Sequence, residues 1–299
     1  MIEIVNLTKK FKDKTAVNNI NLTIKEGELF ALLGTNGAGK TTTIKMMSTL
    51  ILPTSGEIKV SGYEIKKDSM KIKEIVNVSP QETAIAPNLS VKENLEFMAG
   101  VYKIKNKNKK IEELVNMFKL QEVLKQKAKT LSGGWQRKLS IAISLINNPK
   151  ILFLDEPTLG LDVIARRELW SVIEQLKGKI TIILTTHYME EAARANHIAI
   201  MDHGRLISYG TPFELKDEFA KDKLRLYYKP DKENVLITRL KEQNVIYFKK
   251  DTYVSLRLNR TMDAMRYLEE LRDDINGFEV IQGTMDDVFL HVTGGEKDA

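Results

Sequence analysis

The prediction of a fold for this sequence depends on the stretch Gly34-Thr35-Asn36-Gly37-Ala38-Gly39-Lys40-Thr41-Thr42. It satisfies the phosphate-binding pattern G-x-x-x-x-G-K-[ST]. The apolar run at 28–33 has the length of a buried strand, and residues 40–50 continue at helical spacing. Strand, glycine loop and helix are the context that the motif requires, which argues against a glycine-rich turn with a chance lysine. The sequence therefore predicts a nucleoside triphosphate site.

Each residue type in this stretch suits phosphate binding. Gly34, Gly37 and Gly39 lack a Cβ, so the chain can turn its N–H groups inward. The helix expected to open at Gly39 adds free amides and the positive end of its dipole. We expect Lys40 to reach the β- and γ-phosphates and the Thr41 hydroxyl to bind magnesium.

Composition narrows the class of protein. The 299 residues suffice for one large domain, or for one with a small appendage. No run approaches the roughly 18 apolar residues of a membrane span, and the N-terminus lacks the features of a secretion signal. Cysteine is absent, which excludes disulfides and thiolate metal sites. The net charge of +6 permits a nucleic acid or an anionic membrane nearby without requiring either.

Two further strands are predicted to end in polar side chains. The apolar run 151–154 leads into Asp155 and Glu156, and the run 180–184 leads into Thr185-Thr186-His187. Open α/β sheets bind ligands at the carboxyl ends of their strands. We therefore expect Asp155 to face magnesium and Glu156 to face the γ-phosphate and a water. The alternatives are acids that cap the next helix and a structural histidine.

A second glycine pair, in Ser132-Gly133-Gly134, opens another predicted helix. Ser132 stands where an N-cap belongs, and the glycines leave amides that could bind phosphate. Since the chain already has a phosphate loop, a second anion-binding helix start needs a different role.

Residues 90–118 predict two helices joined by a basic segment. A capping box, Ser90 with Glu93, opens the first helix. Its predicted buried face consists of Val91, Leu95, Met98 and Tyr102, and that of the second helix consists of Ile111, Leu114, Val115 and Phe118. Five lysines lie between residues 103 and 110. A solvated loop is favoured there over a patch that faces phospholipid or RNA.

The pattern changes near residue 222. Strands and helices then follow in the order βαββαβ, which suggests a small ferredoxin-like unit without a chemical motif. We therefore expect two domains, residues 1–220 and residues 221–299.

Five motifs occur in order: the phosphate loop at 34–42, LSGGWQR at 131–137, ILFLDEP at 151–157, LGLD at 159–162 and TTHYMEEA at 185–192. Over residues 1–220 the chain closely resembles the ATP-binding subunit of ABC transporters. The segment GTMDDVFLHVTG at 283–294 is similar to the C-terminal extension of the drug- and antibiotic-exporter branch. The resemblance implies an α/β fold: a phosphate-loop ATPase core with a mixed sheet, flanking helices and a helical subdomain at about 82–148, followed by a small α+β domain.

The resemblance also implies roles for single residues. Glu156 matches the general base, Gln81 the glutamine that touches the metal and the attacking water, and His187 the γ-phosphate switch. Phe11 stands where the family usually has a tyrosine that stacks on adenine, and Asp162 matches a loop that communicates across a dimer. The implied catalytic residues are Glu156, His187, Gln81 and Lys40; the metal-binding residues are Thr41, Gln81 and Asp155. The implied nucleotide-binding residues are Phe11, Gly34, Thr35, Asn36, Gly37, Ala38, Gly39, Lys40, Thr41, Thr42, Ser132, Gly133, Gly134 and Asp162.

The implied function is ATP hydrolysis that powers transport through a separate membrane permease, with ATP and Mg²⁺ as cofactors. Each ATP would lie between the phosphate loop of one copy and Ser132–Gly134 of a second copy, arranged head to tail, at the cytoplasmic face of the membrane. Export of a drug, antibiotic or other amphipathic substrate is favoured over import. A non-transport ABC ATPase that acts on nucleic acid or ribosomes is the rival class, and the single phosphate loop disfavours it, so no nucleic-acid partner is expected.

Overall fold

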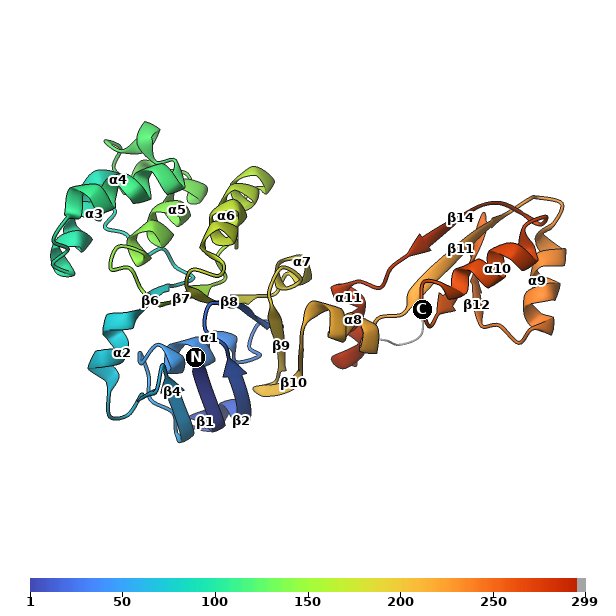
Figure 1. The fold of residues 1–299 in the computed structure, drawn as a ribbon, viewed down its shortest axis with the longest axis horizontal. Helices are drawn as coiled ribbons and strands as arrows, with labels where there is room; N and C mark the ends of the chain where they lie inside the picture. Colours follow the sequence, from blue (N-terminus) through green and yellow to red (C-terminus); the bar gives the residue numbers. More distant parts are fainter. Residues whose placement is uncertain (295–299) are drawn as a thin grey trace. The chain divides into compact units, whose positions relative to one another are not determined.

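The computed structural model describes residues 1–294, and the last five residues of the chain lie outside this range (Figure 1). The chain divides into two compact units, Met1–Thr211 and the residues from Pro212 onward. Helix α8 (Pro212–Phe219) thus belongs to the second unit. The division into functional domains at residue 220 stays a prediction.

The first unit contains an antiparallel sheet in the order β2-β1-β4-β5. Its strands are β1 (Ile2–Phe11), β2 (Lys14–Ile24), β4 (Ser55–Val60) and β5 (Tyr63–Glu64). Strand β1 pairs with both β2 and β4. In the second half of β2 buried and exposed side chains alternate, as expected for a sheet with one face on the core.

A second, six-stranded sheet has the order β10-β9-β3-β8-β7-β6. Its strands are β3 (Leu29–Leu33), β6 (Val76–Ser79), β7 (Ile151–Asp155), β8 (Thr181–Thr186), β9 (His197–Asp202) and β10 (Arg205–Gly210). All but β10 pair in parallel. Leu33 pairs with Thr186, and Asp155 pairs with Thr185. The polar ends of β7 and β8 therefore meet beside the end of β3, where the phosphate loop begins.

The first unit also contains helices. They are α1 (Lys40–Met47), α2 (Ser69–Ile75), α3 (Val91–Val101), α4 (Lys107–Phe118), α5 (Gly133–Ser144), α6 (Val163–Leu176) and α7 (Met189–Ala192), with short 3₁₀ turns at Gln121–Val123 and Ala128–Thr130. Helix α1 contacts β2 of one sheet and β7 and β8 of the other. Helices α3, α4 and α5 contact one another and lie away from β1, β2 and β4 (Figure 1). Among the described residues, no helix has the length and hydropathy needed to cross a bilayer.

The second unit has its own sheet, in the order β12-β13-β11-β14, with every pairing antiparallel. After α8 its elements are β11 (Asp222–Tyr228), α9 (Glu233–Glu242), β12 (Tyr247–Lys249), β13 (Tyr253–Leu258), α10 (Asp263–Leu271), β14 (Ile275–Ile281) and α11 (Met285–Val292). Leu224, Leu226, Leu236 and Leu256 are fully buried in its core. This core is separate from that of the first unit.

Candidate functional site

The part of the phosphate loop that precedes α1, residues 34–39, follows β3 in a conformation that requires glycine at two places. Gly39 has a φ of 101°, and a Cβ added to it would lie 2.5 Å from the Ala16 carbonyl oxygen. A Cβ added to Gly34 would lie 2.4 Å from the Met201 carbonyl oxygen. Both distances are far below van der Waals contact. The glycines therefore allow the loop to pack against neighbouring backbone while α1 begins at Lys40.

The loop borders a cavity of about 380 Å³, which is within the usual size range of small-molecule sites. The predicted residues that line it are Asn36, Gly37, Ala38, Gly39, Lys40, Thr41, Thr42, Gln81, Glu156 and His187. Three lining residues were not predicted, namely Lys14, Ala16 and Leu159. Lys14 begins β2 after a tight turn, a position that carries no recognisable signal in the sequence.

Glu156 lies between two nitrogen-bearing side chains. Its Oε1 is 3.3 Å from Lys40 Nζ, and its Oε2 is 2.8 Å from His187 Nδ1. Lys40 Nζ also donates to the carbonyl oxygens of Gly34 at 2.7 Å and of Thr35 at 3.1 Å. Glu156 has a φ of 47°, which is uncommon outside glycine and recurs at functional sites. The structure therefore brings three predicted catalytic residues into contact.

Thr41 and Asp155 provide oxygen atoms beside the phosphate loop. Thr41 Oγ1 donates to Asp155 Oδ1 at 2.9 Å, and Thr185 Oγ1 donates to the same oxygen at 2.6 Å. No group of three or more His, Cys, Asp or Glu side chains suited to a metal occurs in residues 1–294. Magnesium usually takes only one or two carboxylates together with waters and substrate phosphates. The two oxygen donors fit that ion. Gln81, the third predicted metal ligand, follows β6 and lines the cavity.

Other predicted nucleotide-binding residues lie outside the lining of this cavity. Ser132 and Gly133 are exposed at the start of α5, and the Ser132 side chain makes no capping hydrogen bond. Asp162 caps α6 by accepting from the Ala165 amide at 2.9 Å. Phe11 ends β1 with 47% of its surface exposed. None of these four residues lines the cavity within one copy.

Arg137 is a buried cation that sequence reasoning missed. Its guanidinium donates to the carbonyl oxygens of Pro80 at 2.6 Å and of Glu156 at 2.7 Å. Burial lowers the pKa of this guanidinium, although the charges of Asp155 and Glu156 oppose the shift. Arg137 therefore connects the segment that leads to Gln81 with the residue expected to be the base.

Glu191 is a buried carboxylate, 3% exposed, and it was also missed. It accepts hydrogen bonds from the hydroxyls of Thr158 and of Thr186, the latter at 2.8 Å. Thr158 follows Glu156 by two residues, and Thr186 directly precedes His187. Glu191 thus ties the loop after one predicted catalytic residue to the strand end before another.

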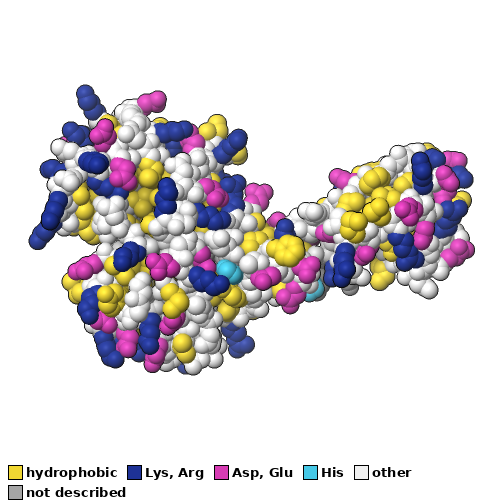
Figure 2. Space-filling view, in the orientation of Figure 1, with side chains coloured by type: hydrophobic (Ala, Val, Ile, Leu, Met, Phe, Trp, Pro, Cys, Tyr) yellow, Lys and Arg dark blue, Asp and Glu magenta, His cyan; other side chains and the backbone are white. Residues whose placement is uncertain are grey.

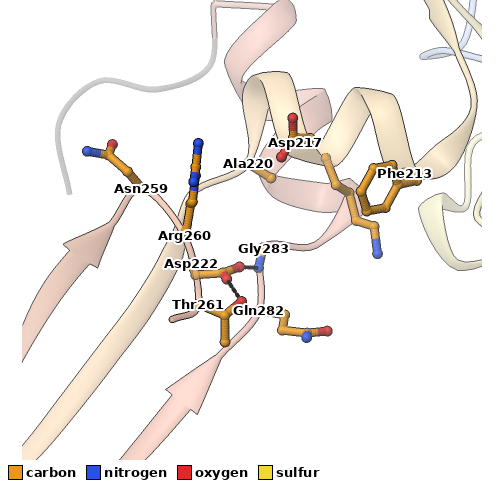
Figure 3. A pocket seen from close by; sticks show the side chains of 10 residues that line it. Phe213, Asp217, Ala220, Asp222, Asn259, Arg260, Thr261, Gln282 and Gly283 are labelled. Atoms are coloured by element: carbon orange, nitrogen blue, oxygen red, sulfur yellow. Dashed lines mark hydrogen bonds between the residues drawn. The ribbon is translucent and has the colours of Figure 1, made fainter. Parts of the chain in front are cut away.

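A second hollow, of about 340 Å³, lies in the second unit and contains no predicted site residue (Figure 3). Asp222 accepts there from the Thr261 hydroxyl and, at 2.8 Å, from the Gly283 amide. These bonds join the loops that follow β13 and β14 to the start of β11. The carboxylate of Asp222 therefore has a structural role.

Two family models match the chain. The ABC transporter model matches residues 17–159, and the model of the C-terminal domain of DrrA1-3-like ATP-binding proteins matches residues 210–293. The Daunorubicin/doxorubicin resistance ATP-binding protein DrrA of Streptomyces peucetius is 34% identical over 308 residues, covering 99% of this chain and 93% of DrrA. The second model confirms that the C-terminal segment is related to DrrA-like ATP-binding proteins, and DrrA itself is named for daunorubicin and doxorubicin resistance.

Another relative and a solved structure agree with this. The probable multidrug ABC transporter ATP-binding protein YbhF of Escherichia coli (strain K12) is 41% identical over 74% of this chain. The matched region spans only 39% of YbhF. The fold is similar to the dimeric structure of the ATP-binding cassette MJ0796 in a post-hydrolysis state bound to ADP and Pi, with a TM-score of 0.64, 27% identity and coverage of 71% of this chain and 98% of the cassette. The chain therefore belongs to the ATP-binding proteins of ABC transporters.

Proposed function

We propose that this protein hydrolyses ATP to power export through a separate membrane permease. The observation that carries the proposal is the contact of Glu156 with both Lys40 and His187 inside the phosphate-loop cavity. In this proposal Lys40 and the loop amides bind the β- and γ-phosphates. Glu156 accepts a proton from the water that attacks the γ-phosphorus, the bond to the β-phosphate oxygen breaks, and ADP and phosphate leave. His187 orients the Glu156 carboxylate.

Thr41, Asp155 and Gln81 would hold magnesium. When bound, the ion neutralises charge on the β- and γ-phosphates. The 2.9 Å hydrogen bond between Thr41 and Asp155 supports this assignment, because it holds two hard oxygen donors beside the loop. The loop amides orient the phosphates, and the buried Thr185 hydroxyl holds the Asp155 carboxylate in place by a hydrogen bond.

A head-to-tail pair of copies would complete each ATP site. The exposed start of α5 supports this arrangement, since Ser132 and Gly133 offer free polar groups that the cavity of their own copy does not use. Asp162 would lie at the same contact. The MJ0796 cassette is dimeric in its post-hydrolysis structure, which makes a pair of copies a reasonable assembly for this chain as well.

The permease would contact the surface near Gln81 and the helices within residues 90–120. Phe97 and Val101 support this, because they lie one turn apart on α3 and are 58% and 56% exposed. Such apolar side chains suit a protein contact better than water. Export is favoured over import because the relatives DrrA and YbhF are named for drug resistance and multidrug transport. The protein would work peripherally, at the cytoplasmic face of the membrane.

The variant Glu156→Gln tests this function. It should still bind ATP, but hydrolysis should fall by about 10²–10⁴-fold, the usual contribution of a general base. The ATP-bound variant should also elute as a dimer in size-exclusion chromatography with magnesium. Glu190→Gln, which removes an exposed carboxylate of the same chain, is the control. Normal hydrolysis by Glu156→Gln would refute the assigned base, and a monomer at saturating ATP would refute the paired site.

A further inference from the structure

A lysine segment, residues 103–109, covers part of the connection between α3 and α4 and the first three residues of α4, and it carries four exposed lysines. They are Lys103, Lys105, Lys107 and Lys109. Within residues 1–294 none of the four forms an ion pair, whereas the next lysine, Lys110, is buried and pairs with Glu113 at 2.9 Å. The sequence alone favours a solvated loop. In the part of the chain that the structure describes, no carboxylate pairs with these four lysines, so the segment carries a patch of net positive charge.

A second lysine-rich stretch of the same unit shows that exposed lysines of this chain do form ion pairs elsewhere. Residues 66–73 also carry four exposed lysines, at positions 66, 67, 71 and 73. Here Lys67 pairs with Glu64 at 2.7 Å, and Lys71 pairs with Asp68 at 2.8 Å. The two stretches therefore carry equal numbers of lysines but differ in local net charge.

Helix stability does not explain the lysine segment. Lys107 is the first residue of α4, Lys109 lies in its first turn, and that turn contains no acidic residue. Cations at a helix N-terminus oppose the helix dipole. Lysines that destabilise the start of the helix in which they lie indicate a function other than folding.

We propose that the lysine segment binds the anionic phosphate headgroups of membrane lipids beside the permease. This inference rests on the proposed function for its location, because the segment begins two residues after Val101, on the surface assigned to the permease contact. Lys and Arg side chains gather along the edge of the unit over α3 and α4 in Figure 2. Clustered lysines attract acidic lipid surfaces. The segment contains no aromatic residue on which an RNA base could stack, which favours lipid over RNA.

The test measures binding of the full chain to vesicles of phosphatidylcholine with and without phosphatidylglycerol. The variant Lys103→Gln/Lys105→Gln/Lys107→Gln/Lys109→Gln should bind the anionic vesicles about a hundredfold to a thousandfold more weakly. Raising the salt from about 0.05 M to about 0.5 M should abolish wild-type binding, since the Debye length shortens severalfold. The control Lys66→Gln/Lys67→Gln/Lys71→Gln/Lys73→Gln removes the same charge and should bind within about tenfold of wild type.

Each outcome decides the proposal. Equal losses in both variants would mean that net charge alone attracts the vesicles, and unchanged binding in the first variant would also refute the segment. Tighter binding of a single-stranded RNA oligonucleotide than of anionic vesicles would assign the segment to nucleic acid instead. ATP hydrolysis is measured in parallel and should be normal in both variants. Loss of hydrolysis by Glu156→Gln without loss of vesicle binding would separate the two proposals.

Discussion

Two glycine-rich helix starts in the first unit, those of α1 and α5, differ in the groups that surround them within one copy of the chain. At the start of α1, Gly39 is packed against backbone, and Lys40 contacts Glu156 inside a cavity. At the start of α5, Gly133 has open space around it, and the Ser132 hydroxyl makes no capping bond. Both helix starts present free amides, but only the first is surrounded by the proposed catalytic groups. The difference is what a site shared between two copies requires.

The variant Gly133→Asp should reduce turnover more than any other variant considered, because it places a negative charge at the start of α5. Its carboxylate would compete for the amides at the start of α5 and repel the phosphate held by a second copy. A group that stabilises charge in trans is worth about 10³–10⁵ in phosphoryl transfer, so steady-state phosphate release should fall by at least about 10³-fold. ATP binding by the phosphate loop should be unchanged. In the control Gly133→Ala, the added Cβ meets nothing within 4 Å. A matching loss of ATP binding in Gly133→Asp would show that α5 supports its own loop instead.

Gly39→Ala tests the first helix start through stability. The new Cβ would lie 2.5 Å from the Ala16 oxygen at a φ of 101°, so the free energy of unfolding should fall by about 3 kcal/mol. Gly37 has a φ of 86° but open space, and Gly37→Ala should cost only about 1 kcal/mol. Denaturant unfolding of both variants measures the difference. Equal and small losses would mean that the loop is not held by its neighbours.

Glu191→Gln tests the link between the strand end before His187 and the loop that leads to Asp162. Glu191 joins Thr186, which precedes His187, to Thr158, which begins the loop that leads to Asp162. An amide cannot accept from both hydroxyls as a carboxylate does, so kcat should fall by about tenfold, or about 1.4 kcal/mol of barrier, while the KM for ATP stays constant. The exposed neighbour provides the control Glu190→Gln. A lower melting temperature with proportional loss of ATP binding would indicate a role in folding only.

The arrangement of the candidate phosphate site could be predicted because its signals are local. A buried strand, a glycine loop and a helix are contiguous in the chain, and the carboxyl ends of β7 and β8 follow from sheet geometry. The capping box of α3 was also local and is confirmed: Ser90 N donates to Glu93 Oε2 at 2.7 Å, and Glu93 N donates to Ser90 Oγ at 3.2 Å.

Features that depend on distant partners could not be predicted. Tyr102 was expected on the buried face of α3, but the helix ends at Val101 and Tyr102 is exposed. The polar Asn94 is buried there, because it hydrogen-bonds to the backbone of Ala86. Arg137 and Glu191 escaped notice for the same reason, since a pattern of apolar residues cannot identify a buried charge whose partners lie far along the chain.

Ser132→Ala should have only a small effect on stability, because the Ser132 side chain makes no capping hydrogen bond. Ser90 and Ser132 both precede helices, but only the Ser90 side chain accepts from a helix amide. Ser90→Ala should therefore cost about 1 kcal/mol of unfolding free energy, the usual value for a lost cap, while Ser132→Ala should cost less than about 0.5 kcal/mol. Denaturant unfolding separates the two values. Turnover should show the opposite order, falling in Ser132→Ala and staying constant in Ser90→Ala, because we propose that the Ser132 hydroxyl binds phosphate held by a second copy. A cap-sized loss of stability in Ser132→Ala with normal turnover would show that the serine stabilises α5 and does not bind nucleotide.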